Sequence, residues 1–132
     1  MPEYTVLAFD FGRRKIGVAV GNTLLRQAQP LEIIDTEVKA QRFARLDGLL
    51  ATWQPTQLVV GLPLTAGGAE QKATHEARRF ANQLRGRTGL PVELVDERYS
   101  SMQAQAHTGN DPDDAVAAAI ILQRYFDGYT GF

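Results

Sequence analysis

The sequence predicts an α/β fold in which a five-stranded mixed sheet carries helices on both faces. Short apolar runs with strand composition alternate with longer segments whose apolar residues recur at helical spacing. The order along the chain is β-β-β-α-β-α-β-α, and a hairpin followed by helical crossovers gives antiparallel and parallel pairs within one sheet. With 132 residues and 44% hydrophobic content, residues 1–132 are expected to form a single domain around its own core.

The first half of the chain is expected to begin with a meander of three strands. Residues 4–10 and 15–21 have strand composition, and the four residues between them, one of them glycine, fit a hairpin. Residues 30–35 are expected to add the third strand. A helix follows over residues 39–54 with its large apolar side chains on one side, and Pro55 ends it.

The second half is expected to alternate strands with helices. Residues 57–61 form a short apolar strand of the kind buried on both faces, and a loop rich in proline and glycine follows over residues 62–69. A polar, basic helix is expected over residues 70–87, and a fifth strand over residues 92–97. Residues 100–106 are expected to form a short helix before the last one.

Composition and charge narrow the class of protein. The chain has no cysteine, which removes disulfides, thiolate catalysis and cysteine-based zinc sites. Its longest apolar run, residues 115–122, is too short to cross a bilayer, and the first residues lack a signal-peptide pattern, so a cytoplasmic protein is expected. Residues 1–90 carry 12 Lys and Arg against 8 Asp and Glu, whereas residues 91–132 carry 2 against 7. This division suits one region that contacts phosphates and another that gathers carboxylates.

The first acidic candidate is Asp10, which ends an apolar strand directly before the basic turn Gly12-Arg13-Arg14-Lys15. Burying a carboxylate at a strand end is unfavourable unless it is compensated, so Asp10 is expected to hold a divalent metal or to orient a phosphate. The alternative is that Asp10 caps the turn and that the three cations form a solvated hairpin tip.

A second acidic pair, Asp96 and Glu97, lies at the carboxyl end of the fifth strand, where open α/β sheets gather functional residues. Strand alternation places the two side chains on opposite faces. Because helices are expected on both faces, this pattern does not decide which acid points into a site. The alternative is an exposed strand end with a local pair between Glu97 and Arg98.

A third acidic cluster opens the last helix, which is expected to run from residue 111 to residue 125 or 126. Asp111 suits the N-cap and Pro112 the first helical position, and first-turn acids favour the helix dipole, so capping alone explains the cluster. Helical spacing from Asp114 follows the apolar face, whereas spacing from Asp113 leads to a wetter side. Asp114 is therefore the acid expected to face the sheet.

Carboxylates from two strand ends and a helix start suit hard divalent cations, since Mg²⁺ prefers oxygen ligands and binds with few carboxylates plus substrate phosphate. Two such ions about 3.5–4 Å apart activate a water and stabilise the leaving oxygen in phosphodiester hydrolysis. Other catalytic sets are weaker. His75 and His107 lack metal-ligand spacing, the Ser100-Ser101 pair lacks a base, and Gly67-Gly68 lacks the flanking residues of a phosphate loop.

Four motifs in chain order resemble the YqgF family, also called RuvX-like. They are residues 6–12 with 16–20, Val59-Val60-Gly61-Leu62-Pro63-Leu64 with Gly67-Gly68, Val95-Asp96-Glu97-Arg98, and Asp114-Ala115-Val116-Ala117-Ala118 before Ile121-Leu122-Gln123. The resemblance covers nearly the whole chain, and four motifs in register make it specific. Members of this family are assigned as bacterial pre-16S rRNA nucleases, and earlier as Holliday junction resolvases.

The resemblance implies an RNase H-like fold and a hydrolase that is a metal-dependent endonuclease of structured nucleic acid. Its first expected role is 5′-end processing of pre-16S rRNA in ribosome biogenesis, and Holliday junction resolution in DNA recombination and repair is the alternative. By matched motif, Asp10, Glu97 and Asp114 are the catalytic and metal-binding acids, with two Mg²⁺ or Mn²⁺ ions as cofactors. The implied partner is structured RNA or branched DNA, bound by a monomer or homodimer, with no membrane partner.

One segment departs from the family pattern. Members usually carry a longer stretch rich in Lys and Arg before the last acidic motif, whereas residues 99–113 are short and contain neither. Phosphate contacts are therefore expected from other cations, namely Arg13, Arg14, Lys15, Lys72, Arg78, Arg79, Arg85 and Arg98. The shortened segment also motivates an alternative, an RNase H-like module that binds nucleic acid or protein without cutting, which the presence of all three acids opposes.

Overall fold

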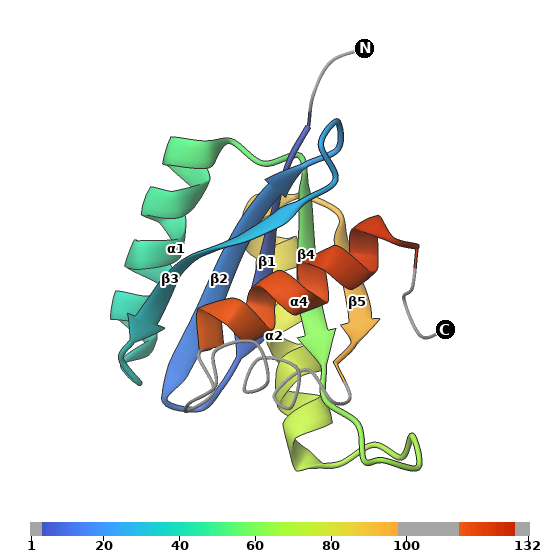
Figure 1. Cartoon of the computed structure of the whole chain (residues 1–132). Helices are drawn as coiled ribbons and strands as arrows, with labels where there is room; N and C mark the ends of the chain where they lie inside the picture. The colour runs from blue at the N-terminus through green and yellow to red at the C-terminus, as the bar shows by residue number, and fades with distance from the viewer. Residues whose placement is uncertain (1–3, 98–113, 129–132) are drawn as a thin grey trace.

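The computed structural model describes residues 4–97 and 114–128, and its elements follow the predicted order (Figure 1). The strands are β1 (Thr5–Phe11), β2 (Lys15–Asn22), β3 (Ala28–Asp35), β4 (Gln57–Leu62) and β5 (Val92–Asp96). The helices are α1 (Lys39–Trp53), α2 (Lys72–Thr88) and α4 (Asp114–Phe126). None of the described helices is long and apolar enough to span a membrane.

The five strands form one mixed sheet in the order β3-β2-β1-β4-β5. β1 pairs with β2 and β2 with β3 in antiparallel fashion, whereas β4 runs parallel to both β1 and β5. The predicted α/β fold with a five-stranded mixed sheet is confirmed. Because β1, β4 and β5 are parallel, their carboxyl ends lie at one edge of the sheet, beside the turn between β1 and β2 (Figure 1).

Two apolar layers cover opposite faces of this sheet, with α4 crossing one face and α2 lying behind the other (Figure 1). The α1–α2 face is packed with large side chains, among them Leu7, Phe9, Ile16, Val18, Leu58 and Val60 from the strands and Leu46, Phe80 and Leu84 from the helices. The α4 face contains smaller strand residues, among them Ala8, Ala19 and Val59, which pack against Ala118, Ile121 and Leu122 of α4. The sheet therefore has one thick apolar layer and one thin one.

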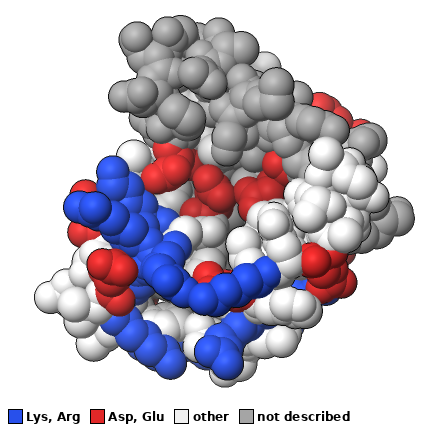
Figure 2. All heavy atoms as spheres, turned by 90° about the horizontal axis from the view of Figure 1, so that it is seen from below, with Lys and Arg blue, Asp and Glu red and all other residues white. Residues whose placement is uncertain are grey.

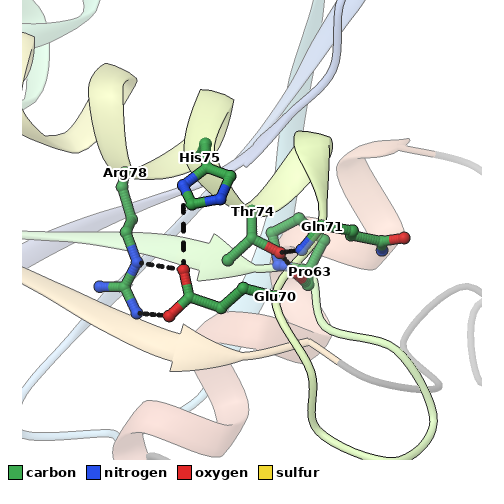
Figure 3. Close-up of polar contacts among 6 residues, drawn as sticks. All are labelled: Pro63, Glu70, Gln71, Thr74, His75 and Arg78. Atoms are coloured by element: carbon green, nitrogen blue, oxygen red, sulfur yellow. Dashed lines mark hydrogen bonds and ion pairs between the residues drawn. The ribbon is translucent and has the colours of Figure 1, made fainter.

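The start of α2 differs from the sequence prediction, because the helix begins at Lys72 rather than at residue 70. A capping box sets this start: the Gln71 side chain accepts from the third helical N–H, and Thr74 Oγ1 accepts from the Gln71 backbone N–H at 2.9 Å. The Thr74 hydroxyl also donates to the Pro63 carbonyl, as Figure 3 shows. The loop after β4 is thus tied to the first turn of α2.

Two other predictions on helices concern residues beyond the described ranges. The short helix over residues 100–106 and the helix start at Asp111 and Pro112 lie outside them. The described part of the last helix, α4, ends at Phe126, within the predicted limit.

Candidate active site

Asp10 and Glu97 come from distant parts of the chain and form a side-chain hydrogen bond. Asp10 lies near the end of β1, and Glu97 follows directly after β5. The backbone N–H of Glu97 donates to the Leu62 carbonyl at 3.2 Å, so the residue stays fixed to the end of β4. Since β4 lies between β1 and β5, the Glu97 side chain has to pass over β4 to reach Asp10.

Gly61 of β4 leaves the space that this crossing needs. Phe9 pairs with Val60, so the next positions along the two strands place Asp10 beside Gly61. A Cβ at Gly61 would lie 2.8 Å from Glu97 Oε2 and 2.5 Å from Ile121 Cδ1. Because both approaches are closer than real Cβ atoms tolerate, only glycine lets the carboxylate of Glu97 lie where it does.

Gly17 of β2 has the same role on the other side of Asp10, with which it pairs directly. A Cβ at Gly17 would overlap the Asp114 carbonyl and lie 2.9 Å from the Ala115 backbone nitrogen. The first residue of α4 therefore rests on the sheet next to Asp10. Two glycines flank one carboxylate, and each admits a different acidic residue to its neighbourhood.

The acids of this cluster perturb one another's pKa values. The pKa of Asp10 is raised from 3.8 to about 6, mainly by burial and further by the charge of Asp114, while the hydrogen bond with Glu97 opposes the rise. Burial, followed by the charge of Asp10 and their shared hydrogen bond, raises the pKa of Glu97 well above its usual value. Arg124 partly opposes this second shift. The cluster therefore resists carrying its full negative charge unless a cation compensates it.

The donor set fits a hard divalent cation through the Asp10–Glu97 pair. Carboxylate oxygens are the ligands that Mg²⁺ and Mn²⁺ prefer, and Mg²⁺ usually binds through one or two carboxylates with water and phosphate oxygens completing its shell. Within the described ranges, no three acidic, histidine or cysteine side chains form a complete cation site. The Asp10–Glu97 pair is thus the described part of this candidate cation site. Asp114 lies close enough for its charge to raise the pKa of Asp10.

The two neighbouring acids after β5 have different surroundings. Val92 and Leu94 belong to the apolar layer of the α1–α2 face, so alternation places Asp96 on that side, where it is 2% exposed. Glu97 lies on the α4 face with Asp10. The Asp96 carbonyl accepts from Arg124 Nη1 at 2.7 Å, which ties α4 to the end of β5. The structure therefore brings Glu97, rather than Asp96, to Asp10.

Arg42 holds the β1–β2 turn and was not singled out in the sequence. Arg42 is 7% exposed, and its guanidinium donates to the carbonyls of Gly12 at 2.9 Å and Arg13 at 2.5 Å. It also donates to the Thr36 carbonyl. The signal was a cation at the helical spacing of the buried Leu46 and Leu49. Arg42 fixes the turn that follows Asp10.

The predicted phosphate-binding cations are distributed unevenly. Figure 2 shows Lys and Arg side chains gathered beside a group of Asp and Glu side chains at this end of the molecule. Arg13 is in the turn next to Asp10 and pairs with Glu76 at 3.4 Å. Arg14 follows in the same turn, and Lys15 is the first residue of β2. Lys72 is the first residue of α2.

The other predicted cations lie further along α2 or beyond the described residues. Arg78 pairs with Glu70 at 3.1 Å, and His75 lies 4.0 Å from the same carboxylate (Figure 3). Arg85 donates to the Val92 carbonyl at the start of β5, which is the end of the strand away from Glu97. Arg79 lines a cavity between α1 and α2. Arg98 lies outside the described residues, as do Asp111 and Asp113.

Comparisons with known proteins identify the family of this chain. A family model described as RuvX, Holliday junction resolvase, matches residues 4–128. The chain belongs to the RuvX family. A Bordetella petrii protein named "Putative pre-16S rRNA nuclease" is 66% identical, over 96% of this chain and 98% of its own length. A Paraburkholderia phytofirmans protein of the same name is 53% identical, over 96% of this chain and 90% of its own.

Solved structures show the fold of this RuvX family member. It superposes on Thermus thermophilus RuvC with a TM-score of 0.56 and 17% identity, over 94% of this chain and 95% of that one. A structure of the same RuvC in complex with a Holliday junction substrate gives a TM-score of 0.59 and 18% identity, over 97% and 96%. These likenesses confirm the RNase H-like fold that the sequence resemblance implied.

Proposed function

We propose that this protein is a metal-dependent endonuclease that hydrolyses phosphodiester bonds of structured RNA and processes the 5′ end of pre-16S rRNA. The observation that carries the proposal is the meeting of Asp10 and Glu97 across β4, beside the start of α4. Close relatives carry a pre-16S rRNA nuclease name, which supports the choice of substrate. Such a substrate would place the activity in the cytoplasm.

In this proposal Asp10, Glu97 and Asp114 hold one or two Mg²⁺ or Mn²⁺ ions. Bound there, the ions would lower the pKa of a water and stabilise the leaving oxygen of the phosphodiester. The protein supplies a buried acidic cluster whose pKa values are raised mainly by burial and further by the charges of neighbouring acids. Ion binding would favour the ionised form of both carboxylates. The turn cations Arg13 and Arg14 would contact the phosphates on either side of the cut.

The test is the Asp10→Asn variant, compared with wild type on structured RNA in the presence of Mg²⁺ or Mn²⁺. Cleavage is expected to be abolished while the melting temperature is kept, because removing one charge from a group of mutually repelling acids does not weaken the metal-free fold. Asp35→Asn is the matched control, since Asp35 is exposed on β3. Cleavage by Asp10→Asn at more than a few per cent of the wild-type rate contradicts the assignment.

Holliday junction resolution is the second candidate, because the matching family model carries that description. A resolvase cuts two strands symmetrically, which requires a two-fold symmetric dimer, whereas trimming one RNA end does not. The same assay with a four-way DNA junction separates the two, provided that the oligomeric state is measured alongside. Binding of nucleic acid without cleavage of any substrate would instead identify a non-cutting module.

A further inference from the structure

A cavity of about 320 Å³ lies between α1 and α2, on the face of the sheet opposite Asp10 and Glu97. It is at the small end of the range of about 300–1,000 Å³ typical of ligand sites. Its walls come from β1, the β1–β2 turn, the segment before α1, and both helices. Phe11, Phe43 and Phe80 line it with aromatic rings, and Lys39, Arg79 and Glu37 are among its charged residues. None of the acids proposed to bind metal lines this cavity.

Three aromatic rings form the apolar part of the wall. Phe11 stacks on Phe80 with ring centroids 4.7 Å apart, and the Arg42 guanidinium lies 5.4 Å from the Phe11 ring. These two rings are therefore held in place by packing. Phe43 of α1 adds a third, half-buried ring, with the Arg87 guanidinium 4.8 Å and Lys39 Nζ 6.0 Å from its centroid. The apolar wall is suited to a flat, unsaturated ligand.

Cations outnumber acids around these rings. Arg13 and Glu76 form an ion pair at 3.4 Å between partly exposed side chains, and Arg42 is engaged with backbone carbonyls. In the part of the chain that the structure describes, no ion pair joins Lys39 or Arg79 to a carboxylate. Both side chains are exposed. The rim thus offers two cations to an anionic group, with Glu37 the remaining acid.

Neighbouring residues of β1 contribute to the cavity and to the acidic cluster. Phe11 lines it, whereas Asp10, the preceding residue, points to the opposite face. Because the cavity and the acids lie on opposite faces of the sheet, a nucleic-acid strand seated in the cavity would reach the acids by passing around the β1–β2 turn. Arg13 and Arg14 lie along that path.

We propose that this cavity binds one unpaired nucleotide, with its base against the aromatic wall and its phosphate at Lys39 and Arg79. The inference rests on the proposed nuclease function and deepens it, because it assigns a single-stranded segment of the substrate to a named site. Aromatic rings beside cations are the usual means of binding single strands without reading their sequence. The same chemistry would accept a free nucleotide.

The experiment measures binding of a short single-stranded RNA that carries one 2-aminopurine, in EDTA so that binding is separated from cleavage. Phe43→Leu keeps an apolar side chain and removes the ring, and is expected to weaken binding roughly ten-fold without changing the salt dependence. Lys39→Gln is expected to flatten the slope of log affinity against log salt by about 0.7, the value for one phosphate contact on a single strand. Arg45→Gln removes a positive charge from α1 outside the cavity, where Arg45 is paired with Glu32 at 2.5 Å. It is the control and, with its melting temperature retained, should bind like wild type.

Two further arms complete the test. A fully duplex RNA of the same sequence should bind with no dependence on Phe43, since its bases are not available for stacking. Competition by adenosine monophosphate would show that a free nucleotide enters the same cavity, and its absence assigns the cavity to the strand. Either result is consistent with a nucleotide site and shows whether its ligand is a free nucleotide or part of a strand.

The inference is overturned if Phe43→Leu and Lys39→Gln, each with its melting temperature retained, bind the single strand as wild type does. It is also overturned if Arg45→Gln weakens binding as much as Lys39→Gln. These results are independent of catalysis. If wild type cuts nothing while the two variants lose binding, the nucleotide site stands and the proposed nuclease function fails.

Discussion

The two faces of the sheet are built from different kinds of side chain. On the α1–α2 face, Leu7, Phe9 and Val60 meet large helical residues and form a thick apolar layer. On the α4 face, Ala8 and Ala19 and the glycines at positions 17 and 61 let α4 approach until its first residue lies on the sheet. The same strands contribute to both faces, because alternate residues point to opposite sides.

This difference separates stability from chemistry. Burial of large apolar side chains is the main favourable term in folding, and it is concentrated on the α1–α2 face. On the α4 face the two positions that flank Asp10 are Gly17 and Gly61, which have no side chain. Three acids from distant parts of the chain can therefore lie close together there. We expect substitutions on the two faces to affect different measurements.

The largest effect on stability is expected from Leu84→Ala on the α1–α2 face. Leu84 is 1% exposed, and a buried Leu→Ala change generally lowers the free energy of unfolding by about 2–5 kcal/mol. Urea denaturation measures this loss. At a temperature where the variant stays folded, its rate of RNA cleavage should remain within a few-fold of wild type. A large loss of activity in folded Leu84→Ala would show that the two faces are coupled.

Gly61→Ala on the α4 face is expected to lower activity more than stability. The new methyl group would lie 2.8 Å from Glu97 Oε2 and displace that carboxylate from Asp10, and misplacement by about 1 Å costs roughly 100-fold in rate. The accompanying loss of stability through overpacking should be about 1–3 kcal/mol.

Gly48→Ala is the matched control for Gly61→Ala. Gly48 is exposed on α1, and a Cβ there meets nothing within 4 Å. Because alanine favours a helix interior by about 0.5–1 kcal/mol over glycine, this variant should be slightly more stable and fully active. Equal activity of Gly61→Ala and Gly48→Ala would disprove the crossing of Glu97 over β4 as a requirement for catalysis.

The remaining expected effect is the pH dependence of stability that Asp10 contributes. Its pKa is about 6 in the folded protein, against about 3.9 in an unfolded chain, so the folded state binds the proton more tightly. Stability of the metal-free protein should therefore fall as pH rises from about 4 to about 6 and stay lower above that. The raised pKa of Glu97 acts in the same direction. At 1.36 kcal/mol per pKa unit, Asp10 accounts for at most about 3 kcal/mol.

Unfolding of wild type and Asp10→Asn by urea in EDTA, at pH 4.5 and at pH 8, isolates this contribution. Asp10→Asn should lose less stability than wild type between the two values, because the amide does not ionise. Parallel losses in the two proteins would mean that Asp10 is not held in an environment that disfavours its charge. Added Mg²⁺ should stabilise wild type at pH 8 more than at pH 4.5, because ion binding requires ionised carboxylates.

The sequence predicted the fold class and the position of Asp10 because both depend on local patterns. Strand composition, hairpin spacing and helical periodicity are read within a few residues. The choice between Asp96 and Glu97 is of another kind. Both faces of β5 are covered, so neither alternation nor composition distinguishes them, and only the pairing of β4 with β5 decides which side chain lies on the α4 face.

The roles of Gly61 and Arg42 also could not be predicted from sequence, because they depend on contacts with residues far away in the chain. Gly61 matters because Glu97, 36 positions later, passes over it, and no local signal records which side chain will cross a glycine. Arg42 occupies an apolar position of α1 because its guanidinium finds carbonyls in a turn from the beginning of the chain. The start of α2 was misplaced for a similar reason, since the Thr74 hydroxyl binds the Pro63 carbonyl in the loop after β4.

The contacts of Arg42 with the β1–β2 turn have a consequence for how the family can diverge. Arg42 donates to the carbonyls of Gly12 and Arg13, and every residue type offers the same carbonyl. The side chains at positions 13 and 14 are therefore not needed to hold the turn. Substitutions there can alter which nucleic acids are contacted while the backbone beside Asp10 keeps its conformation. The side chains at positions 13 and 14 can therefore vary while the carboxylate of Asp10 keeps its place.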